Sequence, residues 1–250
     1  MLTEEFSCTR DGLTIRGTVF RPDESRGPAF ILSHHFLADR GAVRQYAVKL
    51  AENGFRAFTY DFCGGGFRTE SDGKSEKMTV ETEVCDLRAV TEYVKSLSWV
   101  DPEKVSLLGC SQGGFVSAMT ASRYPDGYRK LILFYPALCI PDDARRGNML
   151  ITTFDPENMP ELLCEQPFRL GRCYAETVMN MDPYEEIRHF SGPVLLLHGT
   201  ADEIVNIRYS REAAKVFGQC EYHEFEGAGH GFAGQQDEEA MEYMVRFAKA

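Results

Sequence analysis

The chain has 250 residues, of which 43% are hydrophobic and 26% are charged, a composition typical of a globular protein that buries a sizeable core. Its formal net charge is -11, and its 27 lysines and arginines are scattered along the sequence. Nucleic acids and anionic membranes both call for clustered basic residues, so this balance argues against either partner. No composition shift divides the chain, and we expect a single domain over residues 1–250.

The first residues contain neither a basic run nor an apolar run, and no apolar stretch approaches the roughly 20 residues of a membrane span. The eight cysteines include no Cys-x-x-Cys pair. Disulfides are not expected in a chain that shows no leader sequence. These features predict a cytoplasmic protein without a disulfide framework.

The beginning of the chain predicts a hairpin. Residues 3–9 and 13–21 alternate polar and apolar side chains on either side of Arg10-Asp11-Gly12. An Asp-Gly pair between two alternating runs is a hairpin signal. We therefore expect an antiparallel edge at the start of the sheet.

After the hairpin, short apolar runs alternate with segments whose apolar residues recur at helical spacing. The predicted strands are 28–33, 55–62, 104–108, 130–135, 193–197 and 221–226, and the predicted helices are 41–52, 80–97, 114–123, 207–217 and 237–249. Apolar strands that alternate with amphipathic helices predict the α/β class, with a mostly parallel central sheet flanked by helices on both faces.

Residues 137–182 break this alternation. Prolines and glycines punctuate short possible helices there, and the segment is too long for a plain loop. It also carries several methionines and aromatic residues that an exposed connector would not need. Because function in α/β folds gathers in insertions at the carboxyl ends of strands, we interpret 137–182 as a cap over the active site. The alternative is that these residues complete the core.

The pentapeptide Gly109-Cys110-Ser111-Gln112-Gly113 stands between a predicted strand and a predicted helix. In that setting a Gly-x-Ser-x-Gly sequence is typical of the nucleophile elbow of α/β-hydrolases, a tight turn that exposes the serine hydroxyl. The flanking pattern matters because the pentapeptide alone occurs by chance. The glycine spacing selects Ser111 rather than Cys110 as the nucleophile.

A serine hydroxyl needs a base, and the base needs a carboxylate that holds it in the correct tautomer. In α/β-hydrolases the order along the chain is Ser, then Asp or Glu, then His. His230 lies in a glycine-rich loop after the last predicted strand and is the predicted base, whereas His198 and His223 are interpreted as structural. Asp202 is preferred to Glu203 as the acid because it lies in the short turn after the preceding strand.

The reaction places negative charge on the former carbonyl oxygen, and two backbone N–H groups must stabilise it. One belongs to the residue after the nucleophile, which is Gln112. The other normally lies in the loop after the third strand, and Phe36 is the candidate there. The sequence therefore predicts an oxyanion hole formed by these two residues.

Taken together, the motifs resemble those of the cinnamoyl or feruloyl esterase branch of the α/β-hydrolases. The matching segments are His34-His35-Phe36, residues 61–66, residues 109–113, residues 198–205 and Gly229-His230. The resemblance runs from about residue 13 to 248 and includes the position of the cap. It departs from the family at His35, which stands where the family has glycine and is therefore a candidate contact to the substrate.

The resemblance implies a serine carboxylic-ester hydrolase that forms an acyl-enzyme on small aromatic or short to medium acyl esters, without a cofactor or a metal. An acylglycerol lipase, a thioesterase and a catalytically silent ligand-binding relative stay open. A peptidase of the prolyl oligopeptidase type is less favoured, because 250 residues leave no room for its propeller domain. The expected partner is a small-molecule ester, and a homodimer is left open.

Overall fold

The computed structural model describes residues 1–250, and its chain begins with the expected hairpin. Strands β1 (Leu2–Arg10) and β2 (Leu13–Arg21) pair antiparallel along their whole length. Asp11 (φ 50°) and Gly12 (φ 79°) form the turn between them. Positive φ at both central residues is what a tight hairpin turn requires, since it matches the twist of the flanking strands.

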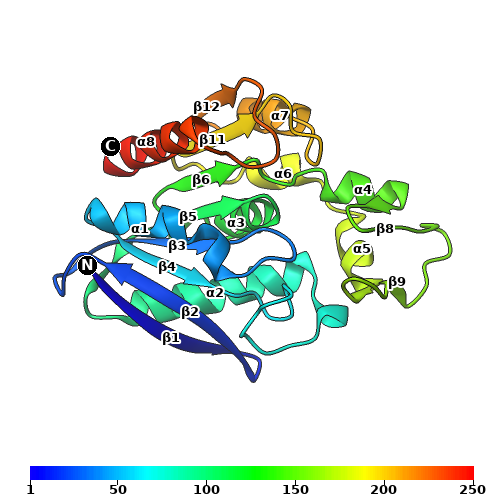
Figure 1. Ribbon diagram of the computed structural model, residues 1–250, viewed down its shortest axis with the longest axis horizontal. Helices are drawn as coiled ribbons and strands as arrows, with labels where there is room; N and C mark the ends of the chain where they lie inside the picture. The colour runs from blue at the N-terminus through cyan, green and yellow to red at the C-terminus, as the bar shows by residue number, and fades with distance from the viewer.

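The hairpin continues into one eight-stranded sheet with the order β1-β2-β4-β3-β5-β6-β11-β12 (Figure 1). The remaining strands are β3 (Gly27–Ser33), β4 (Arg56–Tyr60), β5 (Val100–Cys110), β6 (Leu131–Phe134), β11 (Val194–Gly199) and β12 (Cys220–Phe225). From β4 to β12 all neighbours are parallel, whereas β2 runs antiparallel to β4. The predicted fold class, an α/β-hydrolase fold with a mostly parallel sheet, is confirmed.

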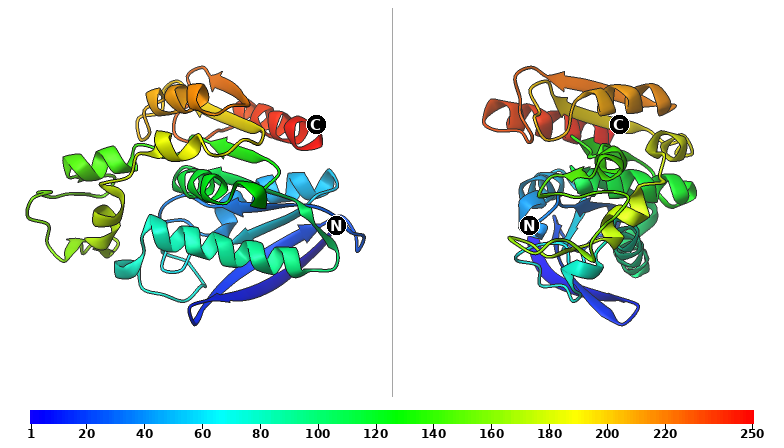
Figure 2. Two further views of the ribbon diagram at one scale, coloured as in Figure 1. Left: turned by 180° about the vertical axis from the view of Figure 1, so that it is seen from behind. Right: turned by 90° about the vertical axis from the view of Figure 1, so that its right-hand side faces the viewer.

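Helices cover both faces of the sheet (Figure 2). One face carries α1 (Arg44–Glu52) and α8 (Gln235–Lys249), and the other carries α2 (Val80–Ser96), α3 (Gln112–Arg123) and α7 (Arg208–Val216). Strand β11 shows why its sequence is continuously apolar: Leu195 and Leu197 pack toward the first group of helices, whereas Leu196 packs toward the second.

Two boundaries differ from those expected. Strand β5 begins four residues earlier, because Val100 already pairs with Gly27 of β3 before a register shift. The first helix is preceded by a 3₁₀ turn over Arg40–Val43, which starts where the Asp39 side chain accepts a hydrogen bond from the N–H of Gly41 (2.7 Å). No helix combines the length and apolar character that crossing a membrane would require.

The segment between β6 and β11 leaves the sheet at its carboxyl edge and projects beyond the end of the strands (Figures 1 and 2). It was expected to form short helices, but it also contains two small antiparallel ribbons, β7–β8 and β9–β10. Its elements are α4 (Ile140–Arg146), β7 (Asn148–Met149), β8 (Thr152–Thr153), β9 (Leu162–Cys164), β10 (Leu170–Gly171) and α5 (Cys173–Val178), followed by α6 (Pro183–Ile187). Such two- and three-residue strands are too short to leave a periodic signal in the sequence.

Candidate active site

Ser111 lies in a sharp turn between the end of β5 and the start of α3. Its backbone has φ 53° and ψ -120°, a left-handed conformation that is costly for a residue with a side chain. The turn is tight because a Cβ on Gly109 would lie 2.2 Å from the carbonyl oxygen of Gly113, and one on Gly113 would lie 2.3 Å from that of Ser33. Glycine is therefore required at both positions, as the elbow interpretation expects.

The structure brings the three residues of the predicted triad into one hydrogen-bonded chain. His230 Nε2 lies 2.9 Å from Ser111 Oγ, and His230 Nδ1 lies 2.8 Å from Asp202 Oδ2. A carboxylate only accepts hydrogen bonds, so Nδ1 donates to Asp202 and Nε2 is left to accept the serine proton. This is the tautomer that a general base requires.

Asp202 is fixed from several sides at the turn after β11. Its Oδ1 accepts hydrogen bonds from the N–H groups of Ile204 (2.9 Å) and Val205 (2.8 Å), and its side chain is fully buried. Burial alone would raise the pKa of Asp202, but hydrogen bonds from His198, His230 and the backbone of Val205 outweigh it and hold that pKa well below its usual range. Asp202 therefore stays ionised at neutral pH, whereas the neighbouring Glu203 is exposed.

His198 and His223 lie where a structural role is expected. His198 is fully buried, and its Nε2 donates to Asp202 Oδ2 (3.1 Å) and to the carbonyl of Val205 (2.9 Å). A carbonyl can only accept, so Nε2 carries the proton and Nδ1 accepts from the Ser210 hydroxyl (2.6 Å). His223 instead contacts Glu221 at 2.8 Å on the outer strand of the sheet. The bridge from Ser210 through His198 to Asp202 was not expected from the sequence.

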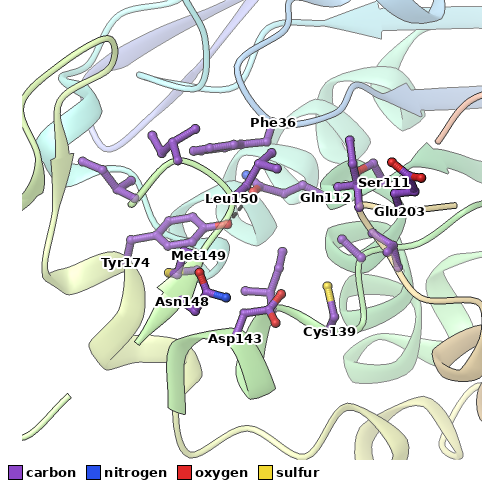
Figure 3. A pocket seen from close by; sticks show the side chains of 16 residues that line it. Phe36, Ser111, Gln112, Cys139, Asp143, Asn148, Met149, Leu150, Tyr174 and Glu203 are labelled. Carbon is purple, nitrogen blue, oxygen red and sulfur yellow. Dashed lines mark hydrogen bonds between the residues drawn. The ribbon is translucent and has the colours of Figure 1, made fainter. Parts of the chain in front are cut away.

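Phe36 and Gln112, the two predicted oxyanion donors, line the same pocket as Ser111 (Figure 3). The N–H of Phe36 donates to no group of the protein, and Gln112 is the first residue of α3, so its N–H has no acceptor within the helix. Both donors are therefore free for a ligand oxygen.

The loop that carries Phe36 is held by His34. This histidine is buried, and its Nε2 accepts a hydrogen bond from the N–H of Phe62 (3.2 Å) while its Nδ1 donates to the carbonyl of His35 (2.8 Å). Burial lowers the pKa of His34, which favours this neutral form. His35 is half-buried and is not among the residues that line the pocket with Ser111, but it lies near His230, whose charge adds to burial in lowering the pKa of His35.

The pocket beside Ser111 has a volume of about 270 Å³ and is lined by 16 residues, of which 11 are hydrophobic. Its lining residues are Phe36, Ser111, Gln112, Ala137, Cys139, Ile140, Asp143, Asn148, Met149, Leu150, Ile151, Leu170, Tyr174, Glu203, Ile204 and Val205. Most of them belong to the segment 137–182. The segment therefore forms a wall of the pocket, in addition to packing against the core.

Cys110 does not compete with Ser111 in this geometry. Its side chain is buried on the face of the sheet that α1 and α8 cover. Burial raises the pKa of the thiol to about 12, so it is not a thiolate at neutral pH. All eight cysteines are free, and no three His, Cys, Asp or Glu side chains are grouped so that they could hold a metal ion.

Comparisons with known proteins agree with this fold. The sequence model of the Prolyl oligopeptidase family matches residues 42–250. The structure of Est1E from Butyrivibrio proteoclasticus with bound ferulic acid is similar over 98% of this chain and 100% of that chain, with 26% identity and a TM-score of 0.89. A peptidase of the prolyl oligopeptidase type was disfavoured because the chain has no room for a propeller domain; the family match includes strands β4 to β12 and the loops that carry Ser111, Asp202 and His230.

Curated relatives are matched over shorter stretches. A protein named as a putative carboxymethylenebutenolidase of Aquifex aeolicus (strain VF5) is 27% identical over 135 residues, which are 50% of this chain and 58% of that protein. The acylamino-acid-releasing enzyme of Mus musculus is 25% identical over 203 residues, which are 76% of this chain and 26% of that enzyme. The match thus spans less than two thirds of either relative's length.

Proposed function

The chain belongs to the prolyl oligopeptidase family of α/β-hydrolases, and from that premise we propose that it is a serine carboxylic-ester hydrolase acting through Ser111, His230 and Asp202. The observation that carries the proposal is the chain of hydrogen bonds from Ser111 Oγ through His230 to Asp202, with lengths of 2.9 and 2.8 Å. Ser111, at the end of these hydrogen bonds, lines a pocket that can hold an acyl group.

In the first half of the proposed reaction, His230 Nε2 takes the proton of Ser111 as Oγ forms a bond to the carbonyl carbon of the ester. The carbonyl oxygen becomes an oxyanion and accepts from the N–H groups of Phe36 and Gln112. His230 then gives its proton to the alcohol as the C–O bond breaks, which leaves an acyl-enzyme. Asp202 remains ionised throughout and stabilises the imidazolium.

In the second half, His230 removes a proton from a water molecule that attacks the acyl carbon. The second tetrahedral intermediate uses the same two N–H groups. When it collapses, the carboxylic acid leaves and Ser111 Oγ recovers its proton from His230. The net reaction is the hydrolysis of one ester to one acid and one alcohol, and it needs no cofactor.

The pocket favours a small aromatic or short to medium acyl group. Its volume of about 270 Å³ is just below the roughly 300–1,000 Å³ that is typical of ligand pockets. Its wall is mostly apolar, and each CH₂ buried there contributes about 0.8 kcal/mol to binding. Met149 adds a side chain that adapts to irregular shapes.

Two polar side chains support a phenolic acyl group in particular. Asp143 and Asn148 lie across the pocket from Ser111 (Figure 3). One oxygen of Asp143 accepts from Arg146 (2.6 Å), and its carboxylate can also accept from a phenolic hydroxyl. The similarity to Est1E, whose structure contains ferulic acid, points to the same class, so a feruloyl or other hydroxycinnamoyl ester is our preferred substrate.

A peptidase is the second candidate, because the matching family and the acylamino-acid-releasing enzyme both point toward amide substrates. A panel of aryl and alkyl esters graded by acyl size, with methyl ferulate and an acetylated amino-acid anilide included, separates the two. The proposal expects the highest kcat/KM for aryl esters and little anilide cleavage. Cleavage of the anilide with kcat/KM above that of every ester would overturn it.

A further inference from the structure

The side chain of Gln112 is tied at both ends inside the protein, which its proposed role as a backbone donor does not require. Its Nε2 donates to Glu83 Oε2 (2.7 Å), and its Oε1 accepts from the hydroxyl of Tyr174. All three side chains are buried. Glu83 belongs to α2, Gln112 to the start of α3 and Tyr174 to α5 of the insertion, so the network joins three separate elements.

Glu83 acts in this network as a neutral acceptor. It is completely buried, and no cation contacts it. Burial raises the pKa of Glu83 well above its usual range, and the negative charge of Asp86 adds to this effect. Its second oxygen, Oε1, has no hydrogen-bond partner, so the carboxyl proton can reside there without displacing Gln112.

Tyr174 also contacts the other proposed oxyanion residue. The centre of its ring lies 5.8 Å from that of Phe36, and Phe168 packs edge-on against the same phenylalanine at 5.8 Å. Tyr174 therefore touches one proposed donor residue through its hydroxyl and the other through its ring. Because neither end of the Gln112 side chain is free to move, the start of α3 is fixed relative to the insertion.

We propose that Tyr174 and Glu83 are positioning residues which hold the two oxyanion donors in place, so that the insertion supports catalysis as well as acyl binding. This inference rests on the proposed ester hydrolysis at Ser111. Loss of this positioning should lower kcat for every acyl group, including an acetyl group that is too small to reach the wall formed by the insertion. A residue that only contacted the acyl group would instead alter KM for large substrates.

The test compares four single variants on 4-nitrophenyl acetate and methyl ferulate. Tyr174→Phe keeps the ring against Phe36 but removes the hydroxyl, and Glu83→Leu removes the acceptor. Glu83→Gln keeps a neutral acceptor of the same shape. Tyr184→Phe is the matched control, because it removes a tyrosine hydroxyl that donates to the carbonyl of Tyr209 (3.3 Å) outside the pocket.

We expect Tyr174→Phe and Glu83→Leu to lower kcat for the acetate about 10- to 100-fold with little change in KM, less than the 10²- to 10³-fold loss when an oxyanion donor is removed. Glu83→Gln should restore kcat to within about threefold of the wild type, and Tyr184→Phe should leave it unchanged. An unchanged kcat for the acetate in Tyr174→Phe, with a raised KM for the ferulate alone, would overturn the proposal.

A second readout separates this proposal from the proposed function. A fluorophosphonate phosphonylates Ser111 through the same oxyanion hole and needs no ester substrate. If no ester in the panel were cleaved, the function would fail, yet slower phosphonylation of Tyr174→Phe and Glu83→Leu than of Tyr184→Phe would still support the positioning role. Equal labelling rates in all variants with unchanged thermal unfolding would contradict it.

Discussion

Two regions meet at the pocket, and they are built in different ways. The carboxyl edge of the sheet carries Ser111, Asp202 and His230 on turns that follow strands whose last residues are buried. The insertion over 137–182 consists of short ribbons and helices, and Leu150 there is 60% exposed. The comparison indicates that rigid strand ends fix the geometry of the reacting atoms, whereas the irregular segment shapes the space that the substrate enters.

The largest effect should follow a change on the sheet side. Ser111→Ala removes the hydroxyl that is hydrogen-bonded to His230 Nε2, and we expect kcat for aryl esters to fall by about 10⁵- to 10⁶-fold. Cys110→Ala should keep most activity, because that thiol faces the opposite core. Steady-state kinetics of both variants provides the check, and appreciable turnover by Ser111→Ala would mean that the nucleophile is elsewhere.

The two adjacent carboxylates offer a sharper test of the same side. Asp202→Asn should keep the fold and lower kcat roughly 10³- to 10⁴-fold, because the amide favours the wrong tautomer of His230. Glu203→Gln should change kcat less than about threefold, since Glu203 is exposed and makes no hydrogen bond to His230. If the two losses were interchanged, the acid would be Glu203.

The network of Glu83, Gln112 and Tyr174, which joins the two regions, leads us to expect that stability depends on pH. Glu83 has a raised pKa in the folded state, so above the unfolded value of about 4.3 the folded chain binds more protons than the unfolded one. Stability from this group therefore falls as the pH rises from about 4.3 toward the raised pKa. Glu83→Gln removes that loss.

The Tm of Glu83→Gln relative to the wild type should accordingly increase between pH 4 and pH 8. The increase should be a few degrees, because 1 kcal/mol shifts the Tm of a domain of this size by roughly 2–4 °C. Thermal unfolding of both proteins at several pH values measures it. A difference in Tm that does not change with pH would show that Glu83 is ionised in the folded protein.

The smallest effect should come from the wall of the insertion. Leu150 is largely exposed at the pocket, so Leu150→Ala should not change Tm but should raise KM for methyl ferulate about 3- to 10-fold. KM for 4-nitrophenyl acetate should stay the same. Leu2→Ala is a matched control, because Leu2 is exposed on the edge strand β1. Equal changes for both esters would show that this part of the wall does not select the acyl group.

The same division explains how much the sequence could predict. Apolar runs, alternation and helical periodicity identified every strand of the main sheet and the long helices that flank it. The glycines of the elbow identified the turn at Ser111. The ribbons of the insertion were missed because two-residue strands have no period. The roles of His198 and Glu83 depend on contacts between elements far apart in sequence, which no local pattern encodes.

His35 illustrates a further limit. A histidine in place of the family's glycine suggested a contact to the substrate, and that contact stays a prediction. In the structure, burial and the charge of nearby His230 lower the pKa of His35. Local sequence could not show this neighbour, because His230 comes from a loop far later in the chain.

The central claim is that Ser111 carries the acyl group during turnover, and the direct measurement is rapid mixing with a 4-nitrophenyl ester followed by mass spectrometry of the quenched protein. We predict that about one acyl group is added per chain before the steady state and that fragmentation places it on Ser111, with no adduct in Ser111→Ala. An acyl group located on Cys110, or steady turnover of the ester by the Ser111→Ala variant, would contradict the account.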